Sequence, residues 1–156
     1  MFTFATDYYL TVFVASLGAF QIAASLGGLN GLLFFKSAWV ARSLGLVVAV
    51  VPFIWFFASG DRNISDHMGG LDANTQGLFF FFGAGSGLVT TLVISSLVNW
   101  RMDGGDQPPE VGLEALRDTN YLRALARSTA YWRKNWRTQT KKYFFGSTGW
   151  RAIFRR

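Results

Sequence analysis

Three long blocks of apolar residues, each nearly free of charge, follow one another through the first hundred residues. They cover about 8–35, 39–59 and 77–100. Each is long enough to cross a bilayer as an α-helix, which needs about 20 mostly apolar residues. The first block exceeds that length, so we expect it to tilt or to extend into the headgroup region. The pattern predicts an all-α integral membrane protein with a three-span body over residues 1–100.

The remaining third of the chain changes character. Residues 101–109 contain Gly-Gly and Pro-Pro pairs, which predict a linker. A basic, aromatic tail is predicted over 110–156 on the cytoplasmic side, and its acidic residues from Glu110 onward suit the positive end of a helix dipole. We therefore expect a helix that begins near Glu110 and ends near Phe144-Phe145-Gly146.

Aromatic and basic residues of the tail segregate on a helical wheel. Tyr121, Leu125, Trp132, Trp136 and Tyr143 share one face, and Arg123, Arg127, Lys134, Arg137 and Lys141 share another. Such a helix is typical of the membrane interface, where aromatic rings enter the headgroup region and cations meet anionic lipid. The predicted membrane-surface residues are Arg123, Arg127, Trp132, Lys134, Trp136, Arg137, Lys141 and Trp150.

Small residues recur at every fourth position within the apolar blocks. Because small side chains let helix backbones approach closely, this spacing predicts helix packing. The predicted packing residues are Ala15, Ala19, Ala23, Gly27 and Gly31 in the first block, Ala41, Gly45 and Ala49 in the second, and Gly83, Gly87, Thr91 and Ser95 in the third. The stripe of five in the first block indicates a partner helix, either within the chain or from another subunit.

Charge divides the chain into two parts and predicts its orientation. Residues 1–99 carry three Lys/Arg against four Asp, whereas residues 100–156 carry twelve Lys/Arg against five Asp/Glu. Lys36 and Arg42 lie near the first connection, and Arg101 and the basic tail follow the third block. Since cytoplasmic segments are enriched in Lys/Arg, we expect the N-terminus outside and the C-terminus in the cytoplasm, with the bacterial inner membrane as the location.

Residues suited to catalysis or to metal binding are scarce. The chain has no Cys, and its single His67 stands in a Gly/Asp-rich loop. A metal site of His67 with nearby carboxylates is an alternative to a solvated turn, but we expect no metal, no cofactor held by side-chain ligands and no enzyme activity. Lipid, pigment or quinone could still pack on the Phe-rich surfaces. The apolar blocks also lack ionisable groups in their interiors, which argues against proton-coupled transport by this chain alone.

These features favour a non-catalytic accessory subunit of a larger membrane complex, with respiratory or photosynthetic electron-transfer assemblies as the first class to consider. The expected partners are other membrane subunits and anionic lipid headgroups. Although Lys/Arg with interleaved Trp/Tyr is also a composition of nucleic-acid-binding segments, a tail tethered to a membrane has lipid as its nearer partner, so we expect no nucleic acid. Two alternatives stay open: a homo-oligomeric channel or small transporter, and a membrane-anchored adaptor that recruits a cytosolic partner.

Overall fold

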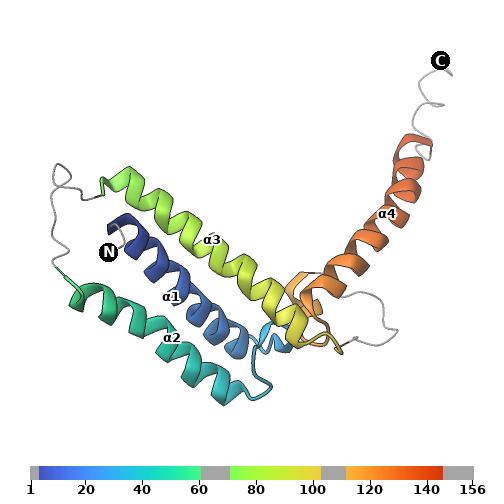
Figure 1. Ribbon diagram of the computed structural model, residues 1–156. Helices are drawn as coiled ribbons and strands as arrows, with labels where there is room; N and C mark the ends of the chain where they lie inside the picture. The colour runs from blue at the N-terminus through green and yellow to red at the C-terminus, as the bar shows by residue number, and fades with distance from the viewer. Residues whose placement is uncertain (1–3, 61–70, 103–111, 146–156) are drawn as a thin grey trace.

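The computed structural model describes residues 4–60, 71–102 and 112–145, with side chains described as far as Trp136 (Figure 1). Within these ranges all regular structure is helical, which confirms the predicted all-α fold for the described part of the chain. The long helices are α1 (Phe4–Leu26), α2 (Ala38–Ala58), α3 (Ala73–Val98) and α4 (Tyr121–Phe145), and the short 3-10 helices are η1 (Asn30–Leu32) and η3 (Gly112–Leu116). The first three are long and apolar enough to cross a membrane.

Helix α1 is the central member of a layer of three helices. It packs on α2 along one side and on α3 along the other, so that α2 and α3 lie apart (Figure 1). The burial of the spans reflects this order, since 39% of the α1 span is buried against 17% of each flanking span. The layer therefore leaves most of α2 and α3, and a strip of α1 between them, on its surface.

The predicted limits of α2 agree with the structure to within one residue, but α1 ends at Leu26, well before Phe35. The reason is a Schellman motif: Gly28 has a positive φ of 66°, and the Leu29 N–H reaches back to the Ala24 carbonyl at 2.9 Å. Glycine is favoured at this position because it has no Cβ to clash in the left-handed conformation. The first apolar block is thus a helix, a cap and a turn, and not one long tilted span.

Helix α3 begins at Ala73, earlier than predicted, because Asp72 caps it. The Asp72 Oδ1 accepts a hydrogen bond of 2.6 Å from the Thr75 N–H. Hydrogen bonds from the side chain and backbone of Thr75 lower the pKa of the Asp72 carboxyl below its ordinary value of 3.8, because they favour the ionised form. The cap satisfies one of the free N–H groups of the first turn.

The predicted start of the tail helix near Glu110 is wrong. Glu110 lies outside the described residues, η3 occupies the next few positions, and α4 begins only at Tyr121. The Asn120 side chain sets this boundary by accepting a hydrogen bond of 2.9 Å from the Arg123 N–H, three residues on. The helix ends at Phe145, in agreement with the prediction from the Phe-Phe-Gly sequence.

The layer formed by α1, α2 and α3 has a basic end and an opposite end. At the basic end, α1 and α3 finish, α2 begins, and Lys36, Arg42 and Arg101 are found. Helix α4 starts at this end and runs away from the three helices in a different direction instead of continuing their line (Figure 1). The N-terminal turn of α1 and the start of α3 lie at the opposite end.

Candidate functional site

The contact between α1 and α2 is one of backbone against backbone. A Cβ added at Gly18 of α1 would overlap the Ala49 nitrogen and the Gly45 oxygen of α2, and a Cβ at Gly45 would lie 2.9 Å from the Gly18 oxygen. Farther toward the basic end, Ala41 of α2 is buried with Ala24 of α1. In lipid, close approach of this kind supplies the dispersion contacts that hold helices together. The predicted positions Ala41, Gly45 and Ala49 all lie along this side of α2.

Helix α3 presents its small residues to the other side of α1. A Cβ at Gly83 would lie 3.0 Å from a Val12 methyl carbon, and a Cβ at Gly87 would lie 2.9 Å from the Ser16 Cβ. The glycines therefore let α3 approach the side chains of α1 closely. The four predicted positions on α3 are all buried: Gly83, Gly87, Thr91 and Ser95.

The predicted stripe of five small residues in the first apolar block does not lie along the α1–α2 contact or along the α1–α3 contact. Ala15 is buried, but Ala19 and Ala23 are exposed on the strip of α1 between α2 and α3. Gly27 lies beyond the end of the helix, and Gly31 lies in η1. The five residues thus divide into a helix surface, a cap and a turn.

Part of that stripe forms the floor of a shallow groove of about 220 Å³ along the layer. Phe53 comes to it from α2 and Phe80 from α3, on either side of the small residues of α1. We call this feature the open groove; its lining residues are Val12, Ala15, Ser16, Ala19, Ala49, Phe53 and Phe80.

Polar side chains gather at the basic end and bind the irregular backbone between α1 and α2. Buried Gln21 donates to the Leu32 carbonyl at 3.1 Å and accepts from the Phe34 N–H at 2.9 Å. The Asn99 amide, just after α3, donates to the Leu33 carbonyl at 2.7 Å. Backbone groups outside a helix are costly in an apolar environment unless they are paired, so these two amides make the turn compatible with such surroundings.

Asn120 connects the same region to the start of α4. It is fully buried, donates to the Asn99 carbonyl at 3.1 Å and caps α4 through the Arg123 N–H. Ser96 of α3 accepts a further hydrogen bond of 3.3 Å from the Leu122 N–H. We call Gln21, Ser96, Asn99 and Asn120 the polar junction, because together they join α1, α3, η1 and α4.

Gly31 lies next to the polar junction, at a position that leaves no room for a side chain. A Cβ there would overlap the Thr119 carbonyl oxygen and lie 2.9 Å from that of Leu116. The turn after α1 and the turn before α4 therefore touch through their backbones. Gly31 packs against the segment before the tail helix and not against a neighbouring span.

Arg42 closes the end of α1. Its guanidinium donates to the Ser25 hydroxyl at 2.9 Å and to the Ser25 carbonyl at 3.3 Å, and it lies over the Trp39 ring. A cation at this position satisfies a carbonyl of the last turn and complements the negative end of the helix dipole.

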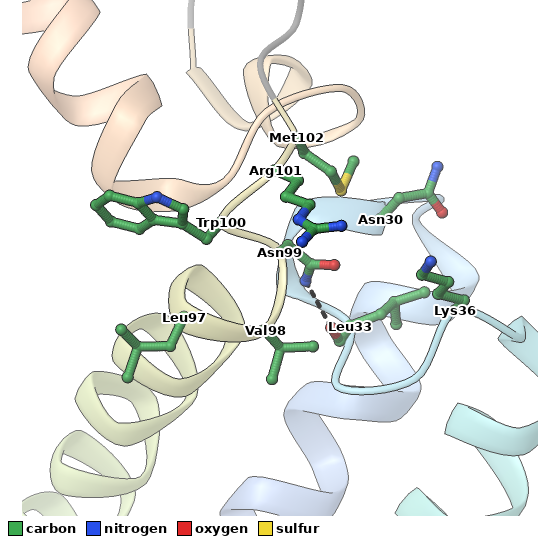
Figure 2. Close-up of a pocket in the computed structure, with 9 residues that line it drawn as sticks. All are labelled: Asn30, Leu33, Lys36, Leu97, Val98, Asn99, Trp100, Arg101 and Met102. Atoms are coloured by element: carbon green, nitrogen blue, oxygen red, sulfur yellow. Dashed lines mark hydrogen bonds between the residues drawn. The ribbon is translucent and has the colours of Figure 1, made fainter.

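A larger pocket, of about 440 Å³, lies beside the polar junction (Figure 2). In Figure 2 the polar ends of Asn30, Lys36 and Arg101 lie around its opening, while Leu97 and Val98 extend from α3 below. We call it the basic-end pocket; its lining residues are Asn30, Leu33, Lys36, Leu97, Val98, Asn99, Trp100, Arg101 and Met102.

The predicted membrane-surface residues are spread along α4 and beyond it. Arg123 is half-buried, donates to the Met102 carbonyl and lies over the Trp100 ring, so it turns toward the bundle. Arg127 is also half-buried, whereas Trp132, Lys134 and Trp136 are exposed. The side chains of Arg137 and Lys141, and Trp150 as a whole, lie outside the described residues.

Potential metal ligands are dispersed in the described part of the chain. Within the described ranges no three His, Cys, Asp or Glu side chains gather in one place. His67, the candidate ligand of the second connection, lies outside those ranges.

Several important residues were missed by the sequence analysis: Gly18, Asn99 and Asn120. Gly18 shares a spacing of seven with buried Thr11 and Ser25, which is the repeat of a close helix pair, so this signal was available. No comparable local pattern marks Asn99, whose acceptor at Leu33 is 66 residues away. Asn120 is a helix cap for the Arg123 N–H three residues on, so a local capping signal was available for it.

No protein-family model matches the chain, and no curated protein and no solved structure matches it significantly.

Proposed function

We propose that this protein is a non-catalytic, multi-pass subunit of a larger membrane complex, and that its open groove receives a transmembrane helix of another subunit. α1, α2 and α3 cross the membrane, with the basic end in the cytoplasm and the bacterial inner membrane as the site. Lys36, Arg42 and Arg101 at that end support this orientation.

The observation that carries the proposal is the position of Ala19 and Ala23. The contacts within the chain use other small residues of α1, above all Gly18, and leave these two alanines exposed. Small residues at a spacing of four favour close approach of a second helix backbone. Acyl chains adapt to any apolar surface and do not require such a stripe, so a helix is the better occupant.

Phe53 and Phe80 support the same reading, because they stand on both sides of the small residues and would contact a helix lying over α1. Respiratory and photosynthetic electron-transfer complexes are the first class that we propose, because the remaining Phe-rich surfaces of α2 and α3 could pack against pigment or quinone. The absence of ionisable side chains along the groove supports a role in assembly and not in transport.

The experiment is a purification of tagged chain from its native membranes in mild detergent, followed by native mass spectrometry. We expect complexes with other membrane subunits, and we expect Ala19→Leu to remove the subunit that occupies the groove. Gly85→Leu is the matched control, because a Cβ at Gly85 meets nothing within 4 Å and this glycine lies on the outer side of α3.

A chain recovered only as a monomer would refute the proposal. A ring made solely of identical chains would favour the channel alternative. Equal loss of the partner in both leucine variants would show that the groove is not the contact.

The exposed aromatic residues of α4 also support a second role for this chain, attachment of its tail helix to the membrane surface. Helix α4 is fixed at its start by the polar junction, and Trp132 and Trp136 beyond it are 63% and 66% exposed. We propose that this helix lies in the cytoplasmic membrane interface with its aromatic face toward lipid. Tryptophan quenching by brominated lipid would test this: strong quenching supports an interfacial helix, and its absence supports a helix that projects to a cytosolic partner.

A further inference from the structure

The basic-end pocket combines two surfaces of opposite character. Its opening carries Lys36, from the connection before α2, and Arg101, which follows α3, together with the Asn30 amide (Figure 2). Its lower part is formed by Leu33, Leu97 and other apolar groups. A ligand that fills it has a polar part at the opening and an apolar part along α3.

Among the described residues, the cations of the pocket have no acidic neighbour in its lining. In the described part of the chain neither Lys36 nor Arg101 has an ion-pair partner. Both side chains are exposed at the opening. The ammonium and the guanidinium line one pocket with like charge, and an anion bound there accepts charge-assisted hydrogen bonds from both. The Asn30 amide can add a neutral donor.

The position of the pocket along the membrane normal suits a lipid. It lies where α3 ends, beside Trp100, and Leu97 and Val98 are 62% and 55% exposed on the last turn of that helix. If α3 crosses the membrane, these two side chains meet acyl chains while the cations stand at the level of lipid phosphates.

We propose that the basic-end pocket binds one anionic glycerophospholipid of the cytoplasmic leaflet. Lys36 and Arg101 bind its phosphate, Asn30 donates to its headgroup, and an acyl chain lies along Leu97 and Val98. A zwitterionic lipid binds more weakly, because the described lining of the pocket offers no carboxylate to its ammonium group. The inference rests on the proposed membrane insertion but not on the proposed partner subunit.

The site also has a structural consequence. The pocket includes Asn99, which holds the turn after α1 through the Leu33 carbonyl (Figure 2). A lipid bound there therefore stabilises the polar junction from outside.

The test uses the full chain in detergent, with native mass spectrometry after addition of phosphatidylglycerol or phosphatidylcholine. We expect retention of one phosphatidylglycerol with a preference of about tenfold over phosphatidylcholine, and loss of that preference in the double variant Lys36→Gln/Arg101→Gln. The matched control is Arg133→Gln, which removes an exposed cation of α4. An unchanged melting temperature shows that the double variant is folded.

Three outcomes would overturn the proposal. Equal retention of the two lipids removes the need for an anionic headgroup. Equal loss in Arg133→Gln assigns the preference to the general charge of the chain. Inhibition of phosphatidylglycerol binding by an equal concentration of inorganic phosphate shows a site for the free anion and not for a lipid.

Membrane insertion is measured separately, by resistance of the chain to alkaline extraction. Extraction of the chain into the soluble fraction would refute the insertion on which both proposals rest. A resistant chain without lipid preference would refute the lipid site alone, and loss of the partner subunit would leave the lipid result unchanged.

Discussion

The α1–α2 contact and the polar junction hold neighbouring parts of the same hairpin of helices by different means. Along the helices, Gly18 and Gly45 bring two backbones together with no polar side chain required. At the basic end, where the chain leaves helical geometry, Gln21 and Asn99 hydrogen-bond the exposed backbone. The difference follows from the secondary structure, since a helix pairs its own backbone groups and a turn leaves them for side chains to satisfy.

The comparison also shows how each contact can be broken. The helix contact is sensitive to added volume, whereas the junction is sensitive to lost hydrogen-bonding groups. Mutations that add volume and mutations that remove hydrogen-bonding groups therefore affect different parts of the protein.

Gly18→Leu should have the largest effect, because the added side chain meets α2 backbone and not a flexible side chain. We expect a loss of about 3 kcal/mol of stability from this overpacking. The measurement is unfolding of the detergent-solubilised chain in increasing sodium dodecyl sulfate, followed by circular dichroism. Gly85→Leu, which has open space around it, is the control and should unfold close to the wild type. A tolerant Gly18→Leu would contradict the backbone contact.

Asn120→Ala should cost about 2 kcal/mol, because it removes the cap of α4 and a buried hydrogen bond to the Asn99 carbonyl. The expected damage is local, in contrast to that of Gly18→Leu. Hydrogen exchange should therefore become faster at the Leu122 and Arg123 amides while the α1–α2 contact persists. Asn135→Ala makes the same change inside α4, and comparable acceleration in that variant would argue against a special role for Asn120.

Asp72 should give the smallest effect, one that depends on pH. The pKa of its carboxyl is lowered by Thr75, so the ionised cap stabilises α3 fully above the ordinary value of 3.8, and this contribution disappears as the pH falls through the lowered value. Thermal unfolding of the wild type and of Asp72→Asn is measured at a pH above 3.8 and at a pH below the lowered pKa. The difference between the two proteins isolates the contribution of the ionised cap. Asparagine also caps helices but does not titrate here, so its variant should lose less stability on acidification. Equal losses would show that Asp72 is not responsible.

Hydropathy was sufficient to predict the number of long apolar helices and the position of α2. Runs of about 20 apolar residues permit few other structures, and Ser37 and Ser59 bound the second run closely. Charge placement was sufficient to predict that Lys36, Arg42 and Arg101 belong to one group, because consecutive antiparallel helices bring the first connection and the end of the third together.

The use of the small residues depended on tertiary structure, whereas the end of α1 and the start of α4 follow from local caps at Gly28 and Asn120. Within the spacing of four, a glycine looks the same in the sequence whether it packs against a neighbouring helix, as Gly45 does, or lies in the cap that ends a helix, as Gly27 does. The side of α1 that faces α2 is decided by the turn between them, and that turn is held by Asn99, 66 residues from its acceptor at Leu33. Local patterns specify which surfaces a helix can offer, but distant hydrogen bonds and backbone contacts decide which surface is buried and which, like the open groove, is left for a partner.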